Sequence, residues 1–457
     1  MGQGGYLTLV NSTDTIWRKT YQHSYQMNVW NFPNVVDAQT CVSIYVEWNQ
    51  HFFNNASDDA GEVVYALGDT NDSFEIQANA TSGFDLKVYF LHLKTHSNQN
   101  EALFSLGWNP KGTVSFILSG TKGQYSSSNL NGSSWMRDNL ALLGTKELSE
   151  LCIPGTHHAG MNVKTSNTFG ATACNVLTQT RNVREQLQLG VRYLDISPVL
   201  KEGYYFAGNY RKIEAIYAWQ GATGQSIEHI IEDINAFTLV RQELVILNLS
   251  NSLNTDVEDS MYRSFNTTEW HRLLKLLSKI NHRFHALRSM DLSVKTLNEY
   301  ISQKAAVLII INDTIDLGSY WGKGFFKPSS FHIKYQYTNT NNIAKMAADQ
   351  FEKMKTQSLA YFLLPWTLKQ NTFQASMCFF GTASSIKELA NEANQQLPSL
   401  VYPKISNTTF PNIILVDNLL TSELAAFVMA INWKIHQIIK TNQESPISEK
   451  IILPNKL

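Results

Sequence analysis

The chain has 457 residues, which is longer than one compact domain usually is and suits two. Hydrophobic residues make up 43% of it and charged residues 16%, which is enough apolar material for packed cores and argues against disorder. The 37 Lys and Arg residues balance 38 Asp and Glu residues, a formal charge of −1. No overall charge therefore draws the protein to nucleic acid or to an anionic bilayer.

The cysteines, the N-terminus and the apolar runs give weak indications of compartment. The four cysteines have no C-x-x-C pairing, so we expect neither a zinc site nor a disulfide framework. The N-terminus MGQGGYLTLV lacks the features of a signal peptide, and the longest apolar runs, such as Ala306–Ile311, are strand-length. We expect a soluble or peripheral protein. Its compartment, and the use of sequons such as those at Asn79 and Asn131, stay open.

Residues 1–118 read as an all-β domain. Short alternating runs rich in β-branched and aromatic residues are separated by Asn, Asp, Ser and Gly clusters, without a helical period. This pattern predicts a sandwich or a small barrel. The predicted strands include Tyr6–Val10, Cys41–Trp48, Glu62–Leu67, Leu86–Leu93 and Thr113–Leu118.

Residues 119–134, rich in Gly, Ser and Asn, are expected to link this domain to a second one over residues 135–457. Strands and helices alternate in the second region, which predicts a parallel sheet closed as a TIM-type (β/α) barrel. The predicted strands are Leu148–Ile153, Val191–Ile196, Leu244–Leu249, Ala306–Ile311, Ala360–Leu364 and Asn412–Val416. The predicted helices are Ile227–Phe237, Glu269–Ile280, Ile343–Met354, Ser385–Gln396 and Ser422–Ile439.

Three of these strands end in ionisable groups. The first leads through Pro-Gly-Thr into His157, the segment GVRYLDIS delivers Asp195, and NIILVD delivers Asp417. The C-terminal strand ends of a (β/α) barrel meet at the rim that carries the active site, so we expect these three residues to cluster there as acid/base catalysts. Each has a structural alternative: a packed imidazole, a carboxylate paired with Arg192, and a cap for the last helix.

The segment IPGTHHAGM is similar to the Pro-Gly-Thr-His segment of the X domain of phosphatidylinositol-specific phospholipases C. TRNVREQLQLGVRYLDI, IIEDINAFTLVRQELVILNLS, YFLLPWTLK and PNIILVDNL resemble later segments of that domain. The resemblance covers about Trp135–Asn418 and excludes the N-terminal region. It implies phosphoric diester hydrolysis in lipid metabolism, with a phospholipid or inositol phosphodiester as substrate and peripheral contact with a membrane.

The same resemblance implies roles for single residues. His157 falls on the general base that takes the proton of the attacking inositol 2-hydroxyl. Asp195 falls on a strand-end carboxylate of the site, and Asp417 on the aspartate that orients the base. An imidazole titrates near neutrality and a carboxylate partner fixes its tautomer, so the chemistry fits these residue types.

The chain also departs from the family pattern. His158 stands where the family has Asp, and Ser197 where it commonly has a phosphate-binding Arg. No His lies between Lys201 and Ile227, where the family has its general acid.

Possible contributors are therefore His158, Arg192, Asn209 and Gln220, with Arg211 or Lys212 as a source of charge. Asn and Gln donate hydrogen bonds but do not release a proton near neutral pH. Adjacent residues on an extended loop point apart, which counts against His158.

Two hypotheses follow. The first is a phospholipase C-like phosphoric diester hydrolase that needs no cofactor. The second is a degenerate barrel that binds a phosphorylated headgroup or a glycan without turning it over, with the β domain as a targeting module. A Ca²⁺ site built on Asn162, Asp195 and nearby carboxylates is a weaker third option, because Ca²⁺ takes six to eight oxygen ligands.

Overall fold

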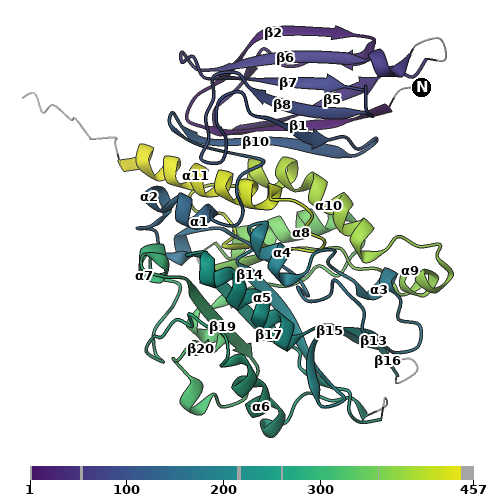
Figure 1. Ribbon diagram of the computed structural model, residues 1–457, viewed down its shortest axis with the longest axis vertical. Helices are drawn as coiled ribbons and strands as arrows, with labels where there is room; N and C mark the ends of the chain where they lie inside the picture. Colours follow the sequence, from purple (N-terminus) through teal and green to yellow (C-terminus); the bar gives the residue numbers. More distant parts are fainter. Residues whose placement is uncertain (1–2, 52–54, 214–217, 259–260, 359, 444–457) are drawn as a thin grey trace, which may run out of the picture.

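The N-terminal part of the chain folds as two facing β-sheets (Figure 1). The computed structural model describes residues 3–51, 55–213, 218–258, 261–358 and 360–443. One sheet has the order β11-β10-β1-β5-β3 and the other β4-β2-β6-β7-β8-β9. All pairings are antiparallel except that of β1 with β10. The strands are β1 (Gln3–Thr13), β2 (Trp17–Tyr25), β3 (Met27–Trp30), β4 (Val35–Val36), β5 (Thr40–Trp48), β6 (Ala60–Leu67), β7 (Ser73–Asn79), β8 (Asp85–Phe90), β9 (Leu103–Gly107), β10 (Thr113–Thr121) and β11 (Gln124–Ser127).

Strands β6, β7 and β8 alternate between buried and more exposed residues, as expected for a sheet with one face on a core. Strands β1 and β10 differ, because most of their residues are buried on both faces. Leu9 and Phe116 belong to the core between the two sheets, whereas Val10 and Ile117 belong to the core of the second region. The sheet containing β1 and β10 is therefore covered on both sides.

The first part of the predicted linker, residues 119–134, is a β-hairpin, whereas residues 128–134 are turns and irregular chain. Residues 119–121 complete β10, and Gln124–Ser127 form β11, which pairs antiparallel with β10. The Gly and Ser content that suggested a linker belongs to this hairpin: Gly123 has φ +83°, a backbone conformation that glycine adopts readily.

The second region is a mixed α/β unit around a curved set of parallel strands in the order β21-β22-β23-β12-β14-β17-β19-β20. Strand β19 is apolar from Ala306 to Ile311, as expected for a strand with both faces buried. The bounds of the parallel strands are β12 (Ile153–Thr156), β14 (Tyr193–Lys201), β17 (Leu244–Ser250), β19 (Ala306–Asn312), β20 (Phe325–Phe326), β21 (Ile333–Lys334), β22 (Tyr361–Trp366) and β23 (Ile413–Val416).

The expected closed barrel is not formed. Within the described residues, β20 and β21 are consecutive strands of two residues each, and no pairing joins them. The segment between them includes a 3-10 turn, Pro328–Ser330, in place of a crossover helix. A two-residue strand offers too few backbone groups for a ladder on both of its sides, so the strand set stays open at this seam.

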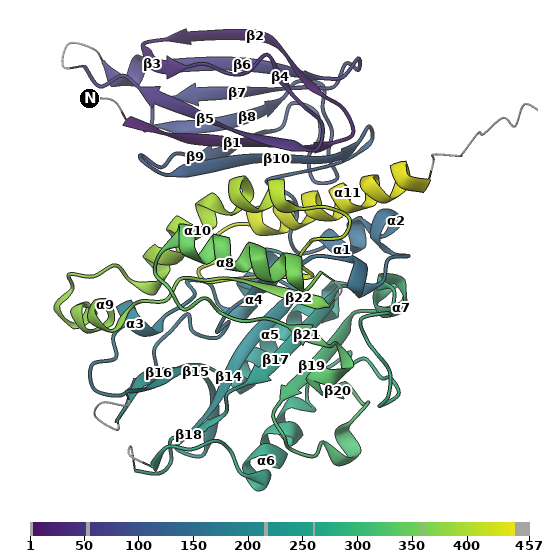
Figure 2. The ribbon, with the colours of Figure 1, turned by 180° about the vertical axis from the view of Figure 1, so that it is seen from behind.

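Helices cover the outside of the parallel strands (Figure 2). Several begin at a Ser, Thr or Asn whose side chain accepts a backbone N–H three residues on, as at Ser385 with Glu388 in α10. The longer helices are α5 (Ile227–Val240), α6 (Thr267–Leu277), α8 (Ile343–Thr356), α10 (Ile386–Val401) and α11 (Glu423–Gln443). The short ones are α1 (Trp135–Asp138), α2 (Leu140–Leu143), α3 (Ala173–Val176), α4 (Val183–Gln188), α7 (Leu297–Ile301) and α9 (Thr372–Met377).

Strand β14 extends beyond the parallel set into an antiparallel sheet that the sequence did not predict. It pairs with β15 (Tyr204–Ile213), β15 pairs with β16 (Ala218–Ser226), and β16 pairs with β13 (Ser166–Asn167), all antiparallel. The short strand β18 (Leu253–Asn254) pairs parallel with β14. Strands β15 and β16 therefore form an extension beside the C-terminal end of β14.

The two regions pack directly on each other, with β1 and β10 lying over α10 and α11 (Figures 1 and 2). Ser12 Oγ donates to the Ala430 carbonyl at 2.8 Å, and the Thr113 N–H donates to Gln395 Oε1 at 3.2 Å. These contacts surround an apolar junction that contains Val10 and residues of α11.

Candidate active site

The strongest pair of candidate residues lies where β12 and β23 end. The sequence placed the first strand at Leu148–Ile153, but Leu148–Glu150 is a 3-10 turn and the strand is Ile153–Thr156, so Pro-Gly-Thr lies within it. Thr156 is opposite Val416 in the parallel pairing, which brings the next residue of each strand to the same level. His157 Nδ1 and Asp417 Oδ1 are 3.0 Å apart.

Backbone contacts hold this pair in place. The His157 N–H donates to the Val416 carbonyl at 3.0 Å. Gln179 Nε2 donates to the His157 carbonyl at 3.0 Å and to the Val416 carbonyl at 3.2 Å. Asn394 Nδ2 from α10 donates to the Asp417 carbonyl at 2.8 Å. Asp417 is therefore the partner of His157 and does not cap the last helix, which was the structural alternative for it.

The ionisation of His157 follows from its neighbours. Burial lowers the pKa of the His157 imidazole, but the charges of Asp417 and Asp195 and the hydrogen bond with Asp417 raise it, and the result lies above the ordinary value. A carboxylate only accepts, so Nδ1–H donates to Asp417. In the neutral ring Nε2 then carries the lone pair, and it has no hydrogen-bond partner in the described part of the chain. This is the arrangement of a general base.

Asp195 lies in β14 beside this pair. Its Oδ1 accepts from Asn248 Nδ2 at 2.8 Å and from Ser250 Oγ at 3.4 Å, both in β17. Burial raises the pKa of the Asp195 carboxyl, while the charge of His157 and these hydrogen bonds lower it in part. Its partners are neutral, so the expected alternative of a pair with Arg192 is wrong.

His158 lies closer to His157 than the sequence suggested. The two rings have centroids 4.1 Å apart, because His158 adopts a left-handed backbone conformation with φ +43° and not an extended one. Such strain in a non-glycine residue is often found at functional sites. Burial and the charge of His157 lower the pKa of His158 well below its ordinary value, and its Nδ1 is buried without a partner among the described residues. These surroundings favour the neutral form of the His158 imidazole.

His157, His158 and Asp417 line a cavity of about 270 Å³. Two cations, Arg211 and Lys369, also line it. Arg211 Nε donates to the neutral Gln220 Oε1 at 3.0 Å, and Lys369 Nζ to Asn339 Oδ1 at 3.3 Å. Both cations thus have neutral hydrogen-bond partners beside the cavity, where an anionic group would be attracted.

The remaining predicted residues lie in different places. Asn209 lines the cavity, although its Nδ2 already donates to the Val176 carbonyl at 3.0 Å. Gln220 accepts from Arg211 through Oε1 and donates to the Gly170 carbonyl through Nε2. Ser197 lines an adjoining cavity that shares His158 and Arg211 with the first one.

Arg192 is not part of the site. It is fully buried, and its guanidinium pairs with Glu243 Oε2 at 2.7 and 2.9 Å and donates to the carbonyls of Gly132, Leu187 and Val191. Glu243 in turn accepts the backbone N–H groups of Met136 and Arg137, at the start of α1. Arg192 precedes β14, whereas the site lies further along that strand. Its role is structural.

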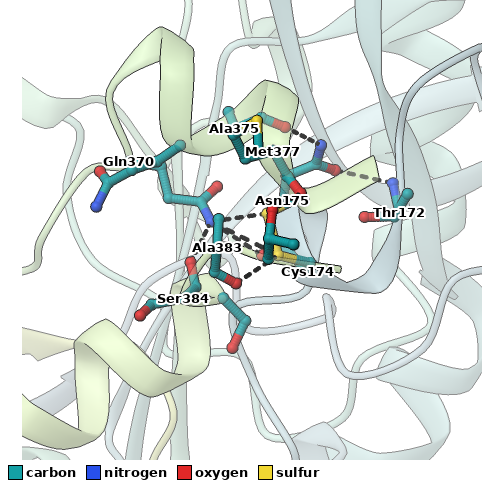
Figure 3. The surroundings of a disulfide bond; sticks show 12 residues. Thr172, Cys174, Asn175, Gln370, Ala375, Met377, Ala383 and Ser384 are labelled. Atoms are coloured by element: carbon teal, nitrogen blue, oxygen red, sulfur yellow. Dashed lines mark hydrogen bonds between the residues drawn. A yellow bond between two sulfur atoms is a disulfide. The ribbon is translucent and has the colours of Figure 1, made fainter. Parts of the chain in front are cut away.

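A disulfide that the sequence did not predict borders the site (Figure 3). It joins Cys174 in α3 to Cys378 in the 3-10 turn Cys378–Phe380, across a separation of 204 residues. Gln370 Nε2 donates to Cys378 Sγ at 3.1 Å and to the Ser384 carbonyl at 2.7 Å. Such a distant pairing has no local spacing signature, which is why the C-x-x-C criterion missed it.

Two further expectations concern metals and membranes. Among the described residues, no three or more His, Cys, Asp or Glu side chains are grouped as ligands for a metal ion. No described helix combines the length and apolar character needed to span a bilayer.

Comparison with known proteins gives structural neighbours only. No protein-family model matches the sequence, and no curated protein matches it. The phosphatidylinositol-specific phospholipase C of Listeria monocytogenes is 18% identical, with a TM-score of 0.47 over 66% of this chain and 99% of that one. The corresponding Staphylococcus aureus enzyme is 13% identical, with a TM-score of 0.48 over 67% of this chain and 99% of that one. At these sequence identities and TM-scores, a function can be proposed only from the residues of the site.

Proposed function

We propose that the protein is a phosphoric diester hydrolase that acts on an inositol-containing phospholipid, with His157 as the general base. The observation that supports this most is the 3.0 Å contact between His157 Nδ1 and Asp417 Oδ1, which leaves Nε2 free at a cavity lined by Arg211 and Lys369. A base beside a cationic cavity suits a substrate that carries both a hydroxyl and a phosphate.

In the proposed reaction, His157 Nε2 takes the proton of a hydroxyl next to the phosphodiester. The hydroxyl oxygen then forms a bond to phosphorus, and the bond from phosphorus to the lipid oxygen breaks. The cyclic phosphodiester that results is opened by water. A positioned base of this kind contributes about 10²–10⁴-fold to the rate.

Charge on the phosphoryl oxygens is stabilised by Arg211. Ser197, two residues after Asp195 in β14, is too short for this role, but Arg211 of β15 lines both the His157 cavity and the adjoining cavity of Ser197. Burial lowers the pKa of the Arg211 guanidinium, and arginine still remains protonated in proteins. Fixed donors at developing charge are commonly worth 10²–10³-fold.

The leaving oxygen has no comparable help. His158 is the second imidazole of the cavity, and its lowered pKa leaves it without a proton to give as a cation. The lipid alkoxide then has to take its proton from solvent. This favours substrates with good leaving groups, such as nitrophenolate, over the natural lipid.

Three exposed phenylalanines next to the disulfide support a lipid substrate. Phe169, Phe373 and Phe380 are 92%, 71% and 70% exposed. Phe380 is two residues from Cys378, and Asn175, beside Cys174, bonds the carbonyls of Gly170 and Ala375 near the other two. Grouped exposed aromatic side chains are typical of surfaces that contact membranes or partners.

The lowered pKa of His158, the second imidazole among the described residues of the cavity, also favours the second candidate function, binding of a phosphorylated headgroup without turnover. One experiment separates the two. Release of inositol phosphates is measured from phosphatidylinositol vesicles and from a soluble nitrophenyl inositol phosphodiester, for wild type and for His157→Ala, with and without chelator.

We expect cleavage of the aryl ester to be much faster than that of the lipid, and lost in His157→Ala. Phe373→Ser should slow cleavage of vesicles but not of the soluble ester. If neither substrate is cleaved while inositol phosphates bind, the binding function is the correct one.

A further inference from the structure

A second cavity lies between the N-terminal sheets and the helices beneath them, separate from the one that contains His157. Its volume is about 340 Å³, within the range of small-molecule sites. Trp108 and Asn109 line it from the loop between β9 and β10, Asn391 and Gln395 from α10, and Glu423 from the start of α11. Figure 2 shows these elements meeting where β10 crosses α10 and α11. Asn109 and Thr421 are exposed, so the cavity is reachable from solvent.

The polar groups of this cavity have unused hydrogen-bonding capacity. Asn391 Oδ1 accepts from Asn418 Nδ2 at 2.8 Å, and Gln395 Oε1 accepts from the Thr113 N–H. Both bonds occupy the amide oxygens. Among the described residues, Asn391 Nδ2, Gln395 Nε2 and the side-chain amide of Asn109 donate to no protein acceptor. These two hydrogen bonds therefore orient the side chains of Asn391 and Gln395 and leave their N–H groups available to a ligand.

The charge of the lining restricts the ligand. None of the described residues that line the cavity is Lys, Arg or His, and Glu423 is its one ionisable group. Burial raises the pKa of the Glu423 carboxyl to about 7, so the group becomes a carboxylate as the pH rises through that value. An anion such as phosphate would meet no cation in the described lining, and a carboxylate above that pH. An acyl chain would cover the side-chain amides of Asn109, Asn391 and Gln395 and the carboxyl group of Glu423. These groups would lose their hydrogen bonds to water and gain none from the chain, which costs free energy for each group.

Apolar side chains also line the cavity, among them Leu397, Leu424 and Phe427. A cyclic polyol or a sugar has C–H faces for such a surface and hydroxyl edges that both donate and accept. Amides supply donors to the hydroxyl oxygens, and a carboxylate accepts from the hydroxyl hydrogens.

We propose that this cavity, which we name the junction cavity, binds a neutral polyhydroxylated molecule of monosaccharide size, held by Glu423, Asn391 and Gln395. The inference is independent of the proposed hydrolase activity, because it rests on residues that do not line the His157 cavity. Asn109 contributes from the β9–β10 loop, so the ligand contacts both regions of the chain.

The test measures binding of myo-inositol and D-glucose to the full chain by calorimetry or ligand-observed NMR. We expect saturable binding of at least one of them. At pH 8, where the Glu423 carboxyl with its pKa of about 7 is ionised, Glu423→Gln should weaken binding about 10-fold, because charge-assisted hydrogen bonds are about twice as strong as neutral ones. Thr113→Phe, which adds bulk at the residue of β10 that contacts Gln395, should abolish it.

Matched variants separate the junction cavity from other causes. Glu392→Gln, on an exposed neighbouring residue of α10, should leave binding unchanged, and so should Arg211→Gln in the His157 cavity. Thermal unfolding shows whether each variant is folded. The proposal is overturned if neither polyol binds, if Arg211→Gln abolishes binding while Thr113→Phe does not, or if choline or inorganic phosphate binds more tightly than both polyols. Failure of the hydrolase assay has no bearing on these outcomes.

Discussion

The position of His157 depends on strand register. Thr156 and Val416 pair across β12 and β23, so that His157 and Asp417 emerge together, and a slip of one residue would turn one of them away. The same alternation places Asp417 towards the His157 cavity and its neighbours Val416 and Asn418 towards the junction cavity. The end of β23 thus contributes residues to both cavities.

The charge of Asp417 should set the pH dependence of activity. Asp417 and Asp195 hold the pKa of His157 above its ordinary 6.5, and only the neutral ring acts as a base. Activity should therefore rise with pH through a value above 6.5. In Asp417→Asn the pKa falls, so the rising limb should move to lower pH while the maximal rate drops about 10²–10⁴-fold.

The measurement is a pH–rate profile on the soluble aryl ester, with Glu392→Gln as the control. An unshifted limb in Asp417→Asn would mean that another group limits the rate.

The sequence predicted the strand-end residues more successfully than their partners. His157, Asp195 and Asp417 follow apolar runs, and such runs can be recognised without a structure. Tyr337 and Lys369 also line the cavity, but Tyr337 follows the two-residue strand β21, and Lys369 lies three residues beyond the end of β22. His158 was judged from an extended geometry that it does not have, since a positive φ in a histidine leaves no pattern in a sequence.

At the level of elements, the disulfide is the main constraint on the rim of the site. It ties α3 to the 3-10 turn after α9, next to Gln370 and Asn175, which line the His157 cavity (Figure 3). A cross-link over a long loop stabilises mainly by restricting the unfolded chain.

Loss of this cross-link should be measurable as loss of stability. We expect Cys174→Ser with Cys378→Ser to reduce the free energy of unfolding by about 2–5 kcal/mol. Denaturant titrations of wild type and of the double variant, each with and without reductant, provide the check. Reductant should destabilise wild type and leave the double variant unaffected. Equal midpoints for wild type in both conditions would contradict a structural role for the bond.

Regular helices were predicted closely, whereas the antiparallel extension was not. Ile227–Phe237 was expected and Ile227–Val240 is found, because a clear helical period and the cap at Ser226 define that segment. Strands β15 and β16 contain Gly, Asn, Gln and Arg, so they lack the apolar run by which a buried strand is recognised.

For the whole molecule, α11 shows how the two regions depend on each other. Leu424 to Ile431 are all buried, so every side of this part of the helix is covered. A helix that is apolar all round belongs inside a core. The parallel strands cover one side of α11, and β1, β10 and β11 cover another (Figure 1).

A truncated chain that starts at Ser133 should therefore fail to fold as a stable monomer, although the sequence suggested two independent domains. Removing residues 1–132 exposes the apolar side of α11 that packs on β1 and β10. We expect aggregation, or a loosely packed state that binds a hydrophobic dye. Size-exclusion chromatography and near-ultraviolet circular dichroism provide the test, with the full chain as control. A cooperatively folded monomer would show that the sandwich is dispensable.

The segment Val416–Asn418 forms a common wall of the two cavities. Asn394 and Asn391 hold it from α10 through the Asp417 carbonyl and the Asn418 side chain. By thermodynamic linkage, any factor by which a polyol in the junction cavity changes the affinity for an inositol phosphate at His157 must equal the factor in the reverse direction. Titration of each ligand at saturating amounts of the other would therefore give the same coupling factor in two independent measurements. That factor measures how strongly the junction cavity, which the sandwich helps to form, is coupled to the site of His157.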